Sequence, residues 1–206
     1  MSDEDPAELT KNGIEKMGGR DYSGAIELFE KAVEIDPSNK EAWNGLGFSY
    51  DGLKNFDKAI ESYNKAIEID PEYKTAINNL GWSYYSLGET GKGNDNYAKA
   101  AEYFDKAIEL DADFKNAWNN KGLALWGLNK LDDSQKAFEK ALEIDPDYST
   151  AKQNLELVKK EIGKTPKAAV KKGAKQELAN DKADAKYAAK QKISGAKSGL
   201  LGKLKK

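Results

Sequence analysis

Apolar side chains recur along most of this chain at intervals of three and four residues, in short segments separated by turn-forming residues. Residues 43–71 contain two such segments, which Lys54 and Asn55 divide. The end of this stretch, Ala-Ile-Glu-Ile-Asp-Pro at 66–71, returns with single changes at 32–37 and 141–146, and in a weaker form at 107–112. Pro37 and Pro71 are 34 residues apart. Paired helical patterns with this period predict an array of helix pairs.

The same pattern gives approximate bounds for several helices. We expect helices over residues 6–18, 22–36, 40–52, 74–87 and 115–127. Asp5 before Pro6 is a good helix start, because an aspartate caps free backbone amides and proline fits the first helical turn. Small residues fall where the two helices of a pair must approach closely, and aromatic residues fill the space between them.

The spacing of these residues resembles the tetratricopeptide repeat (TPR) family over about residues 6–162. The bulky residue, leucine and glycine of the first helix are found at Trp43, Leu46 and Gly47, at Ile77, Leu80 and Gly81, and at Trp118 and Gly122 with Lys121 between them. The second-helix positions are Ala25, Phe29, Ala32 and Pro37, then Ala59, Tyr63, Ala66 and Pro71, and with departures Ala100, Phe104, Ala107 and Ala112, and Ser134, Phe138, Ala141 and Pro146. The resemblance implies an all-α fold: a TPR solenoid of about four helix-turn-helix repeats plus a C-terminal capping helix, wound as a right-handed superhelix.

We expect a repeat domain over residues 1–162, followed by a lysine- and alanine-rich tail over 163–206. The repeats are expected at about 6–39, 40–73, 74–114 and 115–148, and the capping helix at 149–162. The third repeat has 7 surplus residues, and its glycine-rich stretch near 88–95 predicts an inserted flexible loop. The tail is expected to be flexible or marginally helical, because its apolar stripe is mostly alanine and buries too little area to offset the entropy of ordering.

The formal net charge of −2 conceals a strong asymmetry along the chain. Residues 163–206 hold 13 lysines against three acidic residues, so the tail carries +10 and the preceding residues −12. The tail is therefore a candidate electrostatic patch for a nucleic acid or an anionic membrane, bound without sequence selectivity. The lysines predicted to form this patch are Lys164, Lys167, Lys171, Lys172, Lys175, Lys190 and Lys192.

Cysteine and histidine are both absent from the chain. Their absence removes thiol nucleophiles, disulfides, the usual zinc sites and histidine-based triads. Residues 88–93 lack the spacing and the Ser or Thr of a phosphate-binding loop. We therefore expect no enzymatic activity, no cofactor, no metal and no small-molecule substrate. With no apolar run near ~20 residues and an acidic start, the chain is expected to be soluble and cytoplasmic.

Each first helix carries a second stripe of residues besides the one that packs. In the TPR family the first helices line the concave face, so the resemblance implies that this stripe faces a groove. Solvent alone would favour charged residues there, but the stripe is rich in amides and aromatic rings. The predicted groove residues are Asn44, Phe48, Asp51, Asn78, Asn79, Trp82, Tyr85, Asn116, Asn119, Asn120, Leu123 and Trp126. Amides both donate and accept, so they can pair with the backbone of an extended peptide, and the aromatic rings can anchor it. The alternative is that these residues pack adjacent repeats together.

Some TPR proteins hold a C-terminal carboxylate with two lysines, an arginine and two asparagines. The corresponding positions across repeats two to four are Asn44, Phe48, Asn79, Asn116 and Asn120, and none of them is cationic. The sequence therefore does not favour capture of a carboxylate tail. We interpret the chain as a non-catalytic adaptor that binds a peptide segment or a helix of another protein. The alternatives are a scaffold tethered through its basic tail and self-association through the ends of the repeat array, and the oligomeric state is left open.

Overall fold

The computed structural model describes residues 4–165 of the chain. The chain divides into two units, Met1–Lys159 and Lys160–Lys206. Within the described residues all regular secondary structure is helical. In the second unit these residues are 160–165, which form the end of a helix and a turn where Lys164 pairs with Glu161 at 2.9 Å.

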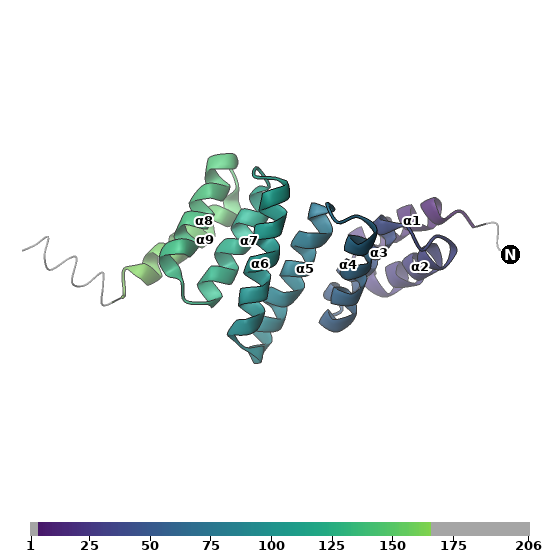
Figure 1. The fold of residues 1–206 in the computed structure, drawn as a ribbon, viewed down its shortest axis with the longest axis horizontal. Helices are drawn as coiled ribbons and strands as arrows, with labels where there is room; N and C mark the ends of the chain where they lie inside the picture. Colours follow the sequence, from purple (N-terminus) through teal and green to yellow (C-terminus); the bar gives the residue numbers. More distant parts are fainter. Residues whose placement is uncertain (1–3, 166–206) are drawn as a thin grey trace, which may run out of the picture. The chain divides into compact units, whose positions relative to one another are not determined.

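Most of the helices have similar lengths and follow one another with short connections (Figure 1). Their bounds are α1 Pro6–Gly18, α2 Tyr22–Ile35, α3 Lys40–Gly52, α4 Phe56–Ile69, α5 Lys74–Leu87, the π-helical turn η1 Gly88–Lys92, α6 Asn94–Leu110, α7 Lys115–Gly127, α8 Leu131–Ile144 and α9 Ser149–Ile162. The expected spans of the first helices of repeats two to four are confirmed by α3, α5 and α7. The predicted cap of α1 is also present, because the Asp5 carboxylate accepts a 2.9 Å hydrogen bond from the amide of Ala7.

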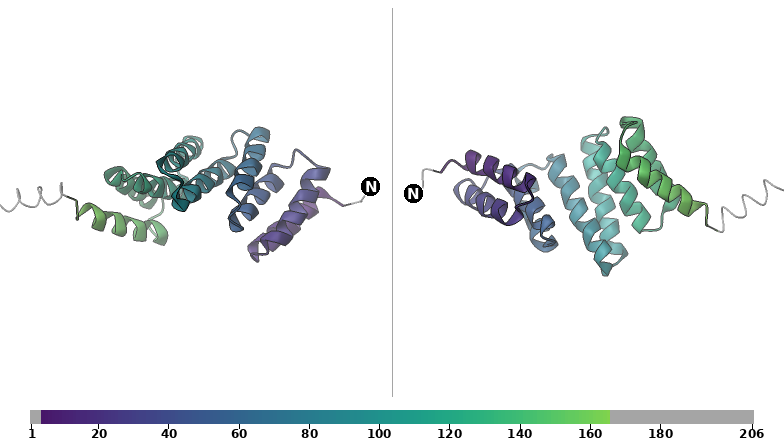
Figure 2. Two further views of the ribbon diagram at one scale, coloured as in Figure 1. Left: turned by 90° about the horizontal axis from the view of Figure 1, so that it is seen from below. Right: turned by 180° about the vertical axis from the view of Figure 1, so that it is seen from behind.

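In the first unit, α1 packs on α2, α3 on α4, α5 on α6 and α7 on α8, which gives four helical hairpins. Each second helix also packs on the first helix of the next hairpin, and the hairpins follow one another in the order of the sequence (Figure 2). The first helices contact one another in succession as well, α1 with α3, α3 with α5 and α5 with α7. The predicted groove residues of α3, α5 and α7 therefore lie on one continuous layer of helices. This second stripe of the three helices, from Asn44 on α3 to Trp126 on α7, is called the outer stripe from here on.

The close approach of the two helices in a hairpin depends on glycine facing an aromatic ring. An added Cβ atom on Gly47 of α3 would lie 2.5 Å from the Tyr63 ring of α4, which is fully buried. Gly122 of α7 has the same relation to Phe138 of α8, also at 2.5 Å. Because interiors are close-packed, a methyl group at either glycine would force the ring or the helix to move. The expected pairing of small and aromatic residues is thus confirmed.

Each of the last three hairpins carries the same ion pair between the start of its first helix and the residue after its second helix. The pairs are Lys40–Asp70 at 2.7 Å, Lys74–Asp111 at 2.6 Å and Lys115–Asp145 at 2.6 Å. In each case the ammonium also lies over the aromatic ring that precedes the next helix, which is Tyr73, Phe114 or Tyr148. Such partly exposed pairs contribute little individually, and the same arrangement recurs at the three junctions that follow α4, α6 and α8.

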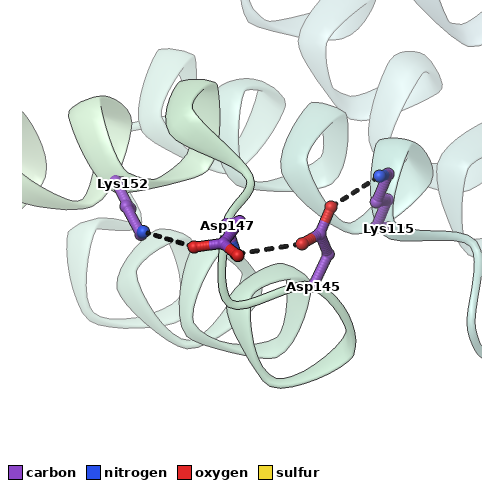
Figure 3. Close-up of polar contacts among 4 residues, drawn as sticks. All are labelled: Lys115, Asp145, Asp147 and Lys152. Atoms are coloured by element: carbon purple, nitrogen blue, oxygen red, sulfur yellow. Dashed lines mark hydrogen bonds and ion pairs between the residues drawn. The ribbon is translucent and has the colours of Figure 1, made fainter.

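Figure 3 shows the last of these junctions, where α8 gives way to α9. Asp145 accepts from the Lys115 ammonium and from the backbone amide of Asp147, the latter at 2.9 Å. The Asp147 carboxylate in turn contacts Lys152 of α9 at 3.4 Å. The hydrogen bond from Lys115 lowers the pKa of Asp145, so this carboxylate is ionised at neutral pH.

The stretch near 88–95, where the sequence predicts an inserted flexible loop, contains a π-helical turn and a reversal of the chain at Gly91 and Gly93, and part of the surplus residues lies in helices. α5 continues into the π-helical turn η1, and α6 has 17 residues where α4 and α8 have 14. Gly91 and Gly93, with φ of 84° and 88°, supply the left-handed conformations needed to reverse the chain. The Tyr97 ring packs against Gly88 and Gly127, where added Cβ atoms would lie 2.6 and 2.8 Å from it. This packing joins the insertion to the end of α7.

Candidate functional site

The predicted groove residues lie on the outer stripe of α3, α5 and α7, but they differ in exposure. Trp82 and Phe48 are the most open of the large apolar side chains there, with exposed fractions of 40% and 43%. Partly buried residues are Asn44, Asp51, Asn79, Tyr85, Asn120, Leu123 and Trp126. Asn116 is exposed in the first turn of α7 and lines neither of the cavities described below.

The asparagines of this stripe form an unbroken ladder of amide hydrogen bonds across successive first helices. Asn79 donates to Asn44 at 3.1 Å, and Asn120 donates to Asn78 at 3.2 Å. Adjacent asparagines of the same helix are also hydrogen-bonded: Asn78 donates to Asn79 at 3.4 Å in α5, and Asn119 donates to Asn120 at 3.3 Å in α7. Asn154 of α9 donates to Asn119 at 2.9 Å and starts the ladder. Each donating amide is therefore directed to the next asparagine on the way from Asn154 to Asn44, where the ladder ends.

Two of the amides differ from their predicted place in an open groove. Asn78 and Asn119 have exposed fractions of only 7% and 2%, so neither reaches the surface as a direct peptide contact. A buried amide must find hydrogen-bond partners, and these two find them in the asparagines of the neighbouring repeats. Asn79 and Asn120 are more open and use one donor and one acceptor position each in the ladder. Each amide of this pair retains a second N–H and a second oxygen lone pair for a ligand.

A cavity of about 330 Å³ opens beside the ladder, between α3, α5 and α7. We call it the Asp51 cavity; its lining consists of Tyr22, Phe48, Asp51, Gly52, Tyr63, Asn78, Asn79, Trp82 and Asn120. Six of these residues belong to the predicted groove. The amides and the carboxylate supply the polar part of the wall, and Tyr22, Phe48 and Trp82 supply the aromatic part.

The Asp51 carboxylate is held by hydroxyl groups, and among the described side chains no cation lines the cavity beside it. Ser83 of α5 donates to it at 2.9 Å, and Tyr63 of α4 donates at 3.1 Å. Burial raises the pKa of Asp51 to about 6, and the two hydroxyl donors offset only part of the desolvation. Burial and the nearby Asp51 charge also raise the pKa of Tyr63. The loss of hydration at Asp51 therefore disfavours its negative charge more than the two hydroxyl donors favour it.

A second cavity, of about 380 Å³, lies farther along the same stripe. It is called the Trp126 cavity here and is lined by Tyr85, Glu89, Leu123, Trp126 and Gly127. The Tyr85 ring stacks on the Trp82 ring of the Asp51 cavity, with 5.2 Å between the ring centroids. Burial, followed by the Glu89 charge, raises the pKa of Tyr85 to about 12. The two cavities thus share an aromatic wall, and both are lined by indole rings.

Sequence reasoning missed several residues of this surface. Tyr63 carries the signal of a packing aromatic, although its hydroxyl reaches the Asp51 cavity. Asn154 was not included, but a signal was available: it lies 35 residues after Asn119, the separation that also joins Asn44 and Asn79. Of the predicted tail patch, Lys164 is exposed and paired with Glu161. The others, Lys167, Lys171, Lys172, Lys175, Lys190 and Lys192, lie outside the described residues.

No group of three or more Asp, Glu, His or Cys side chains in residues 4–165 is arranged to hold a metal ion. No helix in this part of the chain has the length and apolar character needed to cross a membrane.

Sequence models of known repeat families match most of the array. The model described as tetratricopeptide repeat matches residues 41–73 and 116–148, and a second model of the same description matches 76–114. A model described as TPR repeat matches residues 21–54. Together these matches cover more than half of the chain. No curated protein sequence matches it.

Solved structures of similar fold include several repeat proteins. A crystal structure of MamA is 27% identical with a TM-score of 0.63, and the match covers 82% of this chain and 96% of that one. A thermophilic TPR protein from Thermus thermophilus is 19% identical with a TM-score of 0.69, over 77% of this chain and 84% of that one. The first TPR of Spaghetti (RPAP3), bound to the HSP90 peptide SRMEEVD, is 23% identical with a TM-score of 0.56, over 62% of this chain and 96% of that one.

Proposed function

The chain belongs to the tetratricopeptide repeat family, and on this premise we propose that it is an adaptor that binds an extended segment of another protein on the outer stripe of α3, α5 and α7. The family fold supports the coarser conclusion, a protein–protein interaction module. The finer proposal, which names the surface and the form of the ligand, rests on the side chains of that stripe.

The observation that carries the proposal is the amide ladder running beside two aromatic cavities. Asn79 and Asn120 each retain donor and acceptor capacity next to the Asp51 cavity. A peptide backbone offers one donor and one acceptor per residue, so amides spaced along the ladder suit an extended chain whatever its sequence. The exposed faces of Trp82 and Phe48 provide area for apolar side chains of that segment.

The residues that line the two cavities argue against an acidic ligand. Outside Lys92, whose side chain is not described, no lysine or arginine of residues 4–165 lines either the Asp51 cavity or the Trp126 cavity, whereas Asp51 and Glu89 do. The solved relative that binds SRMEEVD holds a peptide rich in acidic residues. A carboxylate entering either cavity here would meet like charge and no compensating cation. The proposed ligand is therefore a segment without acidic residues at these positions.

The proposal is tested with a bead-bound library of short random peptides that are acetylated and amidated, so that no terminal charge contributes. We expect the full chain to retain a subset of these peptides. The double variant Asn79→Ala with Asn120→Ala should lose about tenfold or more in affinity for the retained peptides, because two uncharged hydrogen bonds to the backbone disappear. Calorimetry on the resynthesised peptides measures the loss.

The matched control is Asn116→Ala, which removes an exposed amide of α7 outside both cavities. This variant should bind like the unaltered chain, and circular dichroism should show both variants helical. If the double variant retains the same peptides with unchanged affinity, or if no peptide is retained at all, the outer stripe is not the binding surface.

A further inference from the structure

The Asp51 carboxylate differs in its hydrogen-bond partners from the aspartates at the junctions between hairpins. Asp70, Asp111 and Asp145 each hold a lysine within 2.7 Å, and these lysines lower their pKa values. The Asp51 side chain is partly buried, yet among the described residues the groups that hydrogen-bond to its carboxylate are the hydroxyls of Ser83 and Tyr63. A charge taken out of water without a counter-ion costs more than a paired one. The array therefore maintains an unpaired acid at one position, which opens into a cavity.

Besides Tyr63, three further aromatic residues line the cavity. Tyr22, Phe48 and Trp82 line the cavity together with Asp51. Tyr22 and Phe48 lie 6.5 Å apart between ring centroids and are tilted by 54°, so the rings form a wall around the cavity. The faces of aromatic rings attract cations, and tryptophan does so best. Negative charge and ring faces on one cavity are the elements that recognise an ammonium or guanidinium group.

Amide oxygens of the ladder also belong to the wall of the cavity. The oxygens of Asn78 and Asn79 each accept one ladder hydrogen bond and keep a second lone pair. Asn79 is the more open of the two, and its oxygen can accept from an N–H group bound in the cavity. A lysine or arginine side chain carries several donors and no acceptor, which matches the carboxylate and amide oxygens of this cavity.

We propose that the Asp51 cavity receives the side chain of a lysine or arginine of the bound segment. The ammonium or guanidinium group lies against the Asp51 carboxylate, and the aliphatic stem lies along Phe48 and Trp82. This assignment rests on the adaptor function proposed above and names the class of segment that it takes, an extended peptide with a basic residue. The strongly acidic character of the repeat region favours the approach of such a segment.

The same library gives the first test. Peptides retained by the full chain should be enriched in lysine or arginine at one position. The variant Asp51→Asn keeps the shape and one acceptor oxygen but loses the charge, so it should still retain peptides while losing this enrichment. The control Asp57→Asn removes an exposed carboxylate of α4 that lies outside the cavity. This control should keep the enrichment.

The second test uses the unaltered chain and so does not depend on the folding of a variant. A selected lysine peptide, its acetyl-lysine form and its norleucine form are compared by calorimetry. Loss of the ammonium should weaken binding about tenfold or more, as for a hydrogen bond to a charged group. Equal affinity of the three peptides, or retained peptides without basic enrichment, overturns the assignment of the cavity.

The pH dependence provides a third readout. The titratable groups that face the carboxylate are the phenols of Tyr63 from α4 and Tyr22 from α2; α1, α5 and α7 place no charged group in the cavity. With an Asp51 pKa of about 6, only about a tenth of the carboxyl groups are ionised at pH 5. The lysine peptide should therefore bind about tenfold more weakly at pH 5 than at pH 7.5. The norleucine peptide should show no such change, and a lysine peptide with a flat profile contradicts the proposal.

Failure of this proposal and failure of the adaptor function give different results. If peptides are retained and lose affinity on Asn79→Ala with Asn120→Ala, but show no preference for basic residues, then the outer stripe binds a backbone and the cavity does not select a cation. If no peptide is retained, both proposals fail together. If the basic enrichment persists in Asp51→Asn, the cation is bound elsewhere and the assignment to this cavity is wrong.

Discussion

Aspartate has two distinct uses in this array, and they are separated by what surrounds the carboxylate. At the junctions, Asp70 and Asp145 are held by lysines that lower their pKa values, with the hydrogen bond as the largest cause. In the cavity, Asp51 has a pKa raised to about 6 because desolvation outweighs its bonds to Ser83 and Tyr63. The junction carboxylates stabilise the fold when ionised, whereas the cavity carboxylate is tolerated at a cost.

This contrast predicts opposite effects on the pH dependence of stability. A carboxyl whose pKa is raised by folding stabilises the fold below its unfolded pKa, and this contribution is lost as the pH rises through the folded value. For Asp51 the window runs from about pH 4 to about 6, and the contribution lost is about 2 to 3 kcal/mol. Asp51→Asn should therefore gain unfolding free energy relative to the unaltered chain as the pH rises from 4.5 to 7.5.

Urea denaturation at several pH values measures this difference, and Asp70→Asn is the control of opposite sign. Because folding lowers the pKa of Asp70, its contribution is present above the unfolded pKa and is lost as the pH falls. Asp70→Asn should be destabilised at neutral pH, with a deficit that shrinks towards acid. A stability difference between Asp51→Asn and the unaltered chain that does not change with pH is incompatible with a raised pKa at Asp51.

At the scale of the helix, the hairpins were readable from the sequence because their determinants are local and periodic. The small and aromatic residues that predicted α3, α5 and α7 are those that meet in the structure, such as Gly47 and Tyr63. The packing of the insertion could not be read from its glycines alone. It involves Tyr97, whose ring packs against a glycine on each of two hairpins. No local pattern reports a contact of that kind.

The glycine contacts predict a clear difference between two similar substitutions. Gly122→Ala places a methyl group 2.5 Å from the Phe138 ring, so the hairpin must open or the fully buried ring must shift. We expect a loss of about 1 to 3 kcal/mol in unfolding free energy. Gly18→Ala at the end of α1 meets no atom within 4 Å. It should be neutral or stabilising by up to ~1 kcal/mol through helix propensity. Thermal and urea unfolding of both variants distinguish them, and equal stabilities contradict tight packing at Gly122.

At the scale of the whole molecule, the candidate site was only partly predictable from the sequence. The stripe of amides and rings follows from helical periodicity, and most residues of the Asp51 cavity were included in it. The sequence does not show which of the amides are buried and which are exposed, because their exposure depends on how far each first helix is offset from the next. The ladder from Asn154 to Asn44 is a product of that offset. The stripe is therefore both a junction between repeats and a candidate binding surface.

The ladder makes a prediction about how the repeats are coupled. Asn119 is 2% exposed and links Asn154 of α9 to Asn120 of α7. Asn119→Ala leaves both partners, which are partly buried, one hydrogen bond short, and this should cost about 1 to 3 kcal/mol. In an array each repeat contacts only its neighbours, so the loss should be local. Hydrogen exchange should accelerate in α7, α8 and α9 while the amides of α1 and α2 keep their protection.

Asn116→Ala, at an exposed position of the same helix, should change stability by less than about 0.5 kcal/mol. Faster exchange spread evenly over all hairpins, or an equal effect of the two variants, means that the ladder does not couple neighbouring repeats.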